Sequence, residues 1–248
     1  MHAQRRNEYL EVIGIDVWVP RRGVAPAAEG APDGIEEPAP STGAAPAALP
    51  ADVAAEWERL RSEVATCTRC ALHSSRTQGV FGVGNLQADW LVIGEAPGAE
   101  EDRRGEPFVG RAGQLLDAML KAIGLSRETN VFIANVLKSR PPGNRDPKPE
   151  EVAACLPYLM RQIALMRPRL ILAVGRIAAQ NLLATDMSLG RLRGKVHHFG
   201  ELNTPLIVTY HPAYLLRNPG DKRKAWEDLK FARGVFRQVG LGNLGDRT

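Results

Sequence analysis

Short, largely apolar runs alternate with longer amphipathic segments along most of the chain. The apolar runs lie at 90–93, 131–137, 170–174 and 206–209. Apolar residues recur at helical spacing over 52–66, 112–124, 149–166, 176–184 and 221–236. Apolar strands that alternate with helices are typical of parallel sheets covered on both faces. The pattern predicts a three-layer α/β/α fold around a mostly parallel four-stranded sheet, with Asp52 as the N-cap of the first helix.

The first 52 residues differ from the rest of the chain. Residues 1–22 contain one apolar stretch, 10–19, which is too small to bury a core by itself. Residues 23–52 are rich in Ala and Pro, and their burial cannot offset the entropy of ordering. We therefore expect a short N-terminal arm (1–22), a disordered linker (23–52) and a globular domain (53–248). The arm is a candidate contact for a replication or repair protein.

Charge and composition point to a polyanionic partner. Residues 23–50 carry a net charge of −4 in a chain of +4 overall, which leaves +8 for the remainder. Lysines and arginines that neutralise phosphates release condensed counterions, so such a balance favours nucleic acid. No run of eighteen apolar residues and no apolar secretory segment is present, and three cysteines argue against a disulfide framework. These features predict a soluble, cytoplasmic protein.

The segments that follow the predicted strands carry unusual chemistry. Ligands of α/β sheets collect beyond the carboxyl ends of the strands. There the sequence has a glycine-flanked acidic loop from Gly94, a cationic loop with Lys138, Arg140 and Arg145, and His211 beside a proline. Asn135 falls inside a predicted strand, where an amide needs paired hydrogen-bond partners. A structural amide and a base-binding amide both fit this position.

Cys67 and Cys70 form a CxxC pair, with Cys155 far along the chain. Such a pair is typical of a zinc knuckle, a redox pair or part of an iron–sulfur site. His73 would complete a Cys3His zinc set. The spacing alone leaves these alternatives open.

Four ordered segments together resemble the family 4 uracil-DNA glycosylases. They are CTRCAL, GEAPGAEEDRRGEPFVGRAGQLLD, NVLKSRPPGNRDP and YHPAYLLR, and the resemblance covers roughly residues 58–238. It implies an enzyme that flips uracil, the product of cytosine deamination, out of single- or double-stranded DNA. Hydrolysis of the N-glycosidic bond would then leave an abasic site for base excision repair. The resemblance also implies a monomer.

The resemblance implies roles for the residues around the flipped base. Glu95 would position or activate the attacking water, and the neighbouring Ala96 would contact the substrate. Phe108 would stack on uracil, and Asn135 would bond to its Watson–Crick edge. Glu101 would shape the place where a thymine methyl group would otherwise fit.

A second set of residues would stabilise the leaving base and hold the DNA. His211 would stabilise negative charge on departing uracil. Leu215 or Leu216 would fill the gap in the base stack. The residues expected to grip the phosphates are Arg140, Arg145 and Arg217.

The resemblance implies a structural 4Fe-4S cluster, but the chain departs from the pattern. Relatives with the cluster usually have four cysteines, whereas this chain has Cys67, Cys70, Cys155 and, at the remaining position, Ser139. Serine is a harder and more basic ligand than thiolate. A cluster with a non-thiolate ligand, a labile or three-iron cluster, and no cluster are the three alternatives. We expect some cluster to be retained, with a structural role.

A catalytically silent module that binds uracil, damaged DNA or single strands, with a structural metal site, is the alternative function. Such a module would need the basic loops but neither Glu95 nor His211. Both residues are present, which favours the enzyme.

Overall fold

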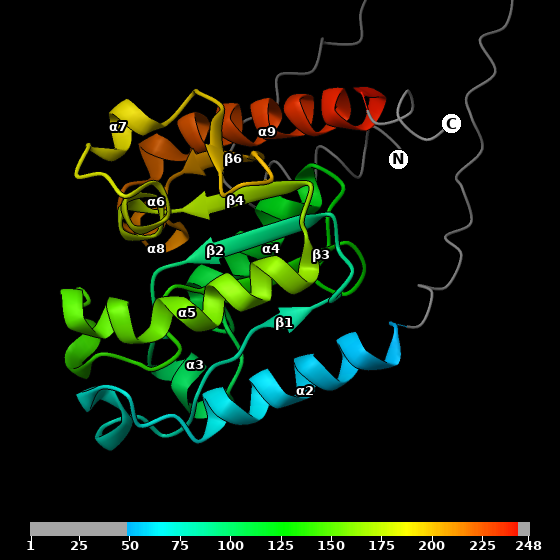
Figure 1. Ribbon diagram of the computed structural model, residues 1–248. Helices are drawn as coiled ribbons and strands as arrows, with labels where there is room; N and C mark the ends of the chain where they lie inside the picture. The colour runs from blue at the N-terminus through cyan, green and yellow to red at the C-terminus, as the bar shows by residue number, and fades with distance from the viewer. Residues whose placement is uncertain (1–48, 243–248) are drawn as a thin grey trace, which may run out of the picture.

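A six-stranded sheet lies at the centre of residues 49–242, the part of the chain that the computed structural model describes (Figure 1). The N-terminal arm and nearly all of the predicted linker lie outside these residues. The strands, in the sheet order β1-β3-β2-β4-β6-β5, are β1 (Val83–Gly84), β3 (Val131–Asn135), β2 (Trp90–Gly94), β4 (Leu170–Val174), β6 (Thr204–Thr209) and β5 (His197–Phe199).

The four expected strands are the central parallel strands of this sheet. β3, β2, β4 and β6 pair in parallel, and Gly94 at the end of β2 is opposite Asn135 at the end of β3. The structure adds two short antiparallel edge strands, β1 against β3 and β5 against β6. Neither is a continuous apolar run, because each has only one neighbouring strand and is partly exposed. The α/β class is confirmed, and the sheet is wider than the four strands expected.

Helices cover both faces of the sheet (Figure 1). Alternate residues of each strand point to opposite faces. In β2, Leu91 and Ile93 belong to a core with residues of α2, α5 and α6, whereas Trp90 and Val92 pack with residues of α4, α8 and α9. The bounds of these helices are α2 (Ala51–Ala65), α4 (Arg111–Ala122), α5 (Pro149–Met166), α6 (Arg176–Leu183), α8 (Pro212–Arg217) and α9 (Lys222–Gly242).

The first residues of α5 and α2 show how well local sequence rules predict where a helix begins. α5 has the bounds expected from periodicity, with Pro149 at its first position and Glu151 accepting a hydrogen bond from Lys148 N. Asp52 is not the N-cap of α2, because the helix begins one residue earlier and Pro50 precedes it. Asp52 instead lies in the first turn, where its charge favours the helix dipole.

Several short elements were not expected from periodicity. They are α3 (Ala99–Arg104), α7 (Leu189–Leu192) and the 3-10 turns η1 (Ala71–Ser74), η2 (Pro142–Asn144) and η3 (Pro219–Asp221). Each is shorter than two helical turns, which is too short for a periodic signal. Across residues 49–242, no helix combines the length and the apolar character needed to cross a membrane.

Candidate active site

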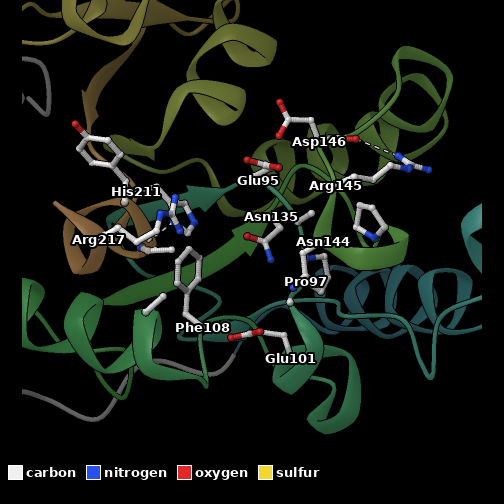
Figure 2. A pocket seen from close by; sticks show the side chains of 16 residues that line it. Glu95, Pro97, Glu101, Phe108, Asn135, Asn144, Arg145, Asp146, His211 and Arg217 are labelled. Carbon is white, nitrogen blue, oxygen red and sulfur yellow. Dashed lines mark hydrogen bonds between the residues drawn. The ribbon is translucent and has the colours of Figure 1, made fainter.

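A cavity of about 380 Å³ opens at the carboxyl ends of the parallel strands (Figure 2). Its walls come from the segments that follow β2, β3 and β6, which are the segments expected from the strand-end rule. The lining residues are Glu95, Ala96, Pro97, Gly98, Glu101, Phe108, Ala112, Asn135, Pro141, Asn144, Arg145, Asp146, His211, Ala213, Tyr214 and Arg217.

Gly94 allows the floor of the cavity to close tightly. A Cβ atom at this position would stand 2.4 Å from Asn135 Oδ1 and 2.7 Å from the Phe108 ring. Any side chain would therefore displace both residues. Glycine at the end of β2 brings together an amide and an aromatic ring that are distant in the sequence.

Asn135 is the last residue of β3 and is only 2% exposed. Its Oδ1 atom is buried and has no hydrogen-bond partner among the described residues. A buried acceptor without a partner costs free energy, so such an atom calls for a ligand that donates to it. The Asn135 side chain lies among the cavity residues (Figure 2).

Phe108 is held in a left-handed backbone conformation, with φ of 55°. Two side chains fix its loop. Val109 N and Gly110 N donate to Glu101 Oε1 at 3.0 and 3.1 Å, and Arg127 donates to the Phe108 carbonyl. The Phe108 ring lies 5.5 Å from the His211 ring, centroid to centroid. The observed contacts of Glu101 are therefore with the backbone that presents Phe108.

His211 has a defined tautomer. Its Nδ1 atom accepts a hydrogen bond from Ala213 N at 3.1 Å, which places the proton of the neutral ring on Nε2. The pKa of His211 is lowered to about 4, mainly by burial and in smaller part by the charge of Arg217, against an opposing contribution from Glu101. At neutral pH the ring is uncharged and has one N–H to donate.

Glu95 follows β2 directly and faces the cavity (Figure 2). Burial raises the pKa of its carboxyl to about 7, with a further contribution from the negative charge of Asp146 and an opposing one from Arg176. Near neutral pH a substantial fraction of Glu95 is therefore ionised. A carboxyl with such a pKa suits proton transfer at physiological pH.

The three predicted phosphate-binding arginines differ in their surroundings. Arg217 lines the cavity at the end of α8. Arg145 also lines it, but both Nη atoms are bonded to the Glu151 carboxylate, at 2.8 and 2.6 Å. Arg140 lies outside the cavity wall and donates to Asn144 Oδ1 at 2.7 Å. Arg140 and Arg145 thus stiffen the loop after β3 by contacts within the protein.

Two residues singled out from the sequence are buried in the structure. Leu215 is 1% exposed and belongs to the core beneath α8, so it does not reach DNA from this position; Leu216 beside it is 37% exposed. Lys138, expected on a phosphate-binding loop, is 1% exposed. Its ammonium donates to Asn135 O and Gln162 Oε1, at 3.0 and 2.6 Å. Sequence alone missed both because neighbouring positions at a strand or helix end face opposite ways.

The three cysteines lie in one region, away from the cavity wall. Burial raises the pKa of the Cys155 thiol, and Cys70 and Cys67 are near enough to add to that rise. At the fourth position, Ser139 Oγ accepts a hydrogen bond from Arg76 at 2.8 Å. The thiols therefore lie in one region without forming a ready-made metal site among the described residues, and the hydroxyl at the fourth position is already bonded to Arg76.

The zinc alternative gains no support from the structure. His73 Nδ1 lies 2.8 Å from the Cys70 carbonyl, at the surface. Within residues 49–242, no three His, Cys, Asp or Glu side chains are arranged to hold a metal ion.

Sequence reasoning missed several residues of the site. Asp146 and Tyr214 line the cavity, and Arg176 at the start of α6 bonds to Asp146 Oδ2 at 2.7 Å. An acid inside an otherwise cationic loop was the available signal for Asp146. Arg176 follows a predicted strand, as the strand-end rule requires, but its contact with Asp146 had no local signal because the two residues are 30 positions apart.

Comparison with known proteins agrees with the geometry of the site. The family model described as the uracil DNA glycosylase superfamily matches residues 81–230. A type-4 uracil-DNA glycosylase of Archaeoglobus fulgidus is 47% identical, over 68% of this chain and 87% of that protein. One of Thermotoga maritima is 42% identical, over 74% and 96%. A type-5 uracil-DNA glycosylase of Thermus thermophilus is 36% identical, over 53% and 68%. The chain therefore belongs to the uracil DNA glycosylase superfamily and, within it, to the type-4 enzymes.

Proposed function

We propose that this protein removes uracil from DNA by hydrolysing its bond to the sugar. The observation that carries the proposal is the buried, unpartnered Oδ1 of Asn135 in the cavity. N3–H of uracil would donate to this atom, and O4 would accept from the amide nitrogen. Cytosine presents the opposite order, an acceptor at N3 and a donor at C4, so the amide would select against it. Type-4 relatives named for uracil-DNA add independent support.

Phe108 is suited to bind the flipped base, and His211 is suited to stabilise the leaving group. Phe108 offers a ring for a base that has left the stack, which compensates part of the unstacking cost of a few kcal/mol. As the glycosidic bond lengthens, negative charge grows on the uracil carbonyl. The neutral His211 would donate its Nε2–H to that oxygen, and because Ala213 already fixes the ring, little reorganisation is needed.

Glu95 is the group that we assign to the water. With a pKa of about 7, its ionised form accepts a proton from the attacking water and lies near the positive charge that develops on the sugar. Leu216 takes the place of Leu215 as the side chain that fills the vacated stack, because it is the exposed member of the pair. Arg217 is the phosphate-binding candidate at the cavity mouth.

Single-turnover excision tests this proposal. A duplex with one uracil is incubated with the protein and treated with alkali, and strand breakage is measured. We expect breakage by the wild type and losses on the order of 10²-fold for Glu95→Ala, Asn135→Ala and His211→Ala. Glu201→Ala and His198→Ala, at exposed positions outside the cavity, are the matched controls. If the wild type binds this duplex but leaves the uracil in place, the chain is instead a damage-binding protein.

We also propose that Cys67, Cys70 and Cys155 bind an iron–sulfur cluster, with Ser139 contributing no ligand. The CxxC spacing and the shared location of the three thiols support this. The cluster would tie the segment before β1 to α5 and leave the reaction to the cavity residues. Iron, sulfide and visible absorbance of the purified protein test the idea. We expect all three to be present and to fall in Cys155→Ala; a colourless, iron-free wild type would disprove it.

A further inference from the structure

Besides Glu101, which is bonded to the backbone of the Phe108 loop, two carboxyl groups lie in the cavity wall. Glu95 follows β2, and Asp146 lies in the loop between β3 and α5. Figure 2 shows both side chains along the same side of the cavity. Asp146 remains 68% exposed at its side chain, so its carboxylate is open to solvent.

Arg176 holds Asp146 from a third segment. Its Nη2 atom lies 2.7 Å from Asp146 Oδ2, and its Nη1 atom donates to Gln180 Oε1 at 3.1 Å. Arg176 is the first residue of α6, directly after Gly175 and β4. The ion pair thus joins the segments that follow β3 and β4, the strands on either side of β2, and the Glu95 segment lies between them in the sheet order β3-β2-β4.

We propose that Asp146 and Arg176 are positioning residues that act through Glu95, as an ion pair that controls the charge of its carboxyl group. This inference rests on the proposed function for its catalytic meaning. A negative charge beside a buried carboxyl opposes its ionisation, and a positive charge favours it. Asp146 accordingly raises the pKa of Glu95 and Arg176 lowers it, in addition to the larger effect of burial.

Other charged groups around the cavity do not replace this pair. His211, from the segment after β6, is neutral near pH 7 because its pKa is lowered to about 4. Arg145 is neutralised by Glu151, and the carboxylate of Glu101 is bonded to the backbone of the Phe108 loop. Arg217 acts on His211 from the α8 side. The charges that act on Glu95 are Asp146 and Arg176.

A functional reason follows from the substrate. DNA brings phosphates to a cavity whose wall contains acidic side chains, and like charges repel. A Glu95 that is partly protonated in the free protein reduces that repulsion, while Asp146 is compensated by Arg176. The pair therefore sets how much of the free enzyme holds Glu95 in its basic form at a given pH.

NMR titration of the Glu95 carboxyl carbon in the DNA-free protein tests the inference without relying on activity. Glu95→Gln identifies the resonance by removing it. We expect Asp146→Asn to lower the Glu95 pKa and Arg176→Gln to raise it, each by about half a pH unit. The double variant should return toward the wild-type value. Glu201→Gln and Arg191→Gln make the same charge changes at exposed positions outside the cavity and should leave the pKa unchanged.

The pH profile of single-turnover excision then separates the inference from the proposed function. If Glu95 is the base, the acid limb of the profile moves with the NMR pKa in both variants. If the NMR pKa moves while the profile does not, the ion pair controls Glu95 but Glu95 is not the base. An NMR pKa that stays at the wild-type value in both variants would overturn the inference, whatever the activity.

Discussion

At the residue scale, the site depends on backbone positions that leave no room for a side chain. Gly175 has φ of +100°, and a Cβ atom there would stand 3.0 Å from His211 Cβ. A Cβ atom at Gly94 would likewise stand too close to its neighbours, 2.4 Å from Asn135 Oδ1 and 2.7 Å from the Phe108 ring. Both glycines end or follow central strands, so they decide how closely the loops of the site approach one another.

Gly175→Ala should therefore displace His211 and slow uracil excision. The methyl group meets the imidazole, and the backbone conformation of Gly175, with φ of 100° and ψ of 166°, is essentially restricted to glycine and adds roughly 1–3 kcal/mol of strain. We expect at least a tenfold fall in the single-turnover rate, since displacement by about 1 Å in an active site can cost on the order of 10²-fold. Gly190→Ala is the matched control, because a Cβ atom there meets nothing within 4 Å. Equal rates for the two variants would contradict the prediction.

At the element scale, a single buried lysine joins strand and helix. Lys138 lies just after the end of β3. Its ammonium donates to Asn135 O, to Gln162 Oε1 on α5 and to Phe81 O before β1. Gln162 Nε2 also donates to Phe81 O, at 3.0 Å. This network holds the end of β3 from behind, which is the end that carries the Asn135 amide.

Lys138→Met should destabilise the protein by about 2–4 kcal/mol, because it leaves several buried acceptors without their donor. Denaturant unfolding of this variant and of Lys195→Met, an exposed lysine, measures the difference. We also expect weaker discrimination for uracil, since the Asn135 carbonyl loses its anchor. A stability within 0.5 kcal/mol of the control, about the usual effect of a surface change, would show that the network is dispensable.

Helix α8 separates neighbouring leucines into different roles. Leu215 packs into the core with residues of α4 and α9, whereas Leu216 is partly exposed. Leu216→Ala should slow excision from duplex DNA more than from a single strand, because only the duplex leaves a gap to be filled. Rates on the two substrates measure this. An equal loss on both would contradict the assignment.

At the scale of the whole molecule, the burial of His211 makes the free energy of unfolding depend on pH. His211 has a folded-state pKa of about 4, below the value near 6.5 that an exposed histidine has. Between these values the unfolded chain binds a proton that the folded protein does not. The contribution of His211 to the free energy of unfolding therefore falls as the pH drops from about 6.5 toward 4, whereas Glu95, whose pKa is raised to about 7, contributes in the opposite direction below that pH.

Urea unfolding across this pH range tests the dependence. We expect the free energy of unfolding of His211→Gln to rise relative to that of the wild type as the pH falls from about 6.5 toward 4, because glutamine does not titrate. His198→Gln, at an exposed position on β5, should follow the wild type. If His211→Gln had the same pH dependence as the wild type, His211 would not be the buried titrating group.

Much of the architecture followed from the sequence because it depends on local patterns. The parallel strands are buried on both faces, so each is apolar throughout, and α5 has a proline and acids at its first turn. The motif residues Glu95, Asn135 and His211 were identifiable because each ends or follows such a strand. The short edge strands β1 and β5 carry too few residues for a pattern.

Only the tertiary structure decided which distant residues contact one another. Sequence placed Lys138 and Leu215 next to functional residues and therefore among them, yet packing turned both into the interior. The Asp146–Arg176 pair and the contact of Arg76 with Ser139 join segments 30 and 63 residues apart. The direction of a side chain and its contacts with distant residues depend on how the whole chain packs, because only packing decides which side chains are buried away from water. The sequence by itself determined the central strands, the longer helices and the motif chemistry, and the fold decided which side chains contact one another.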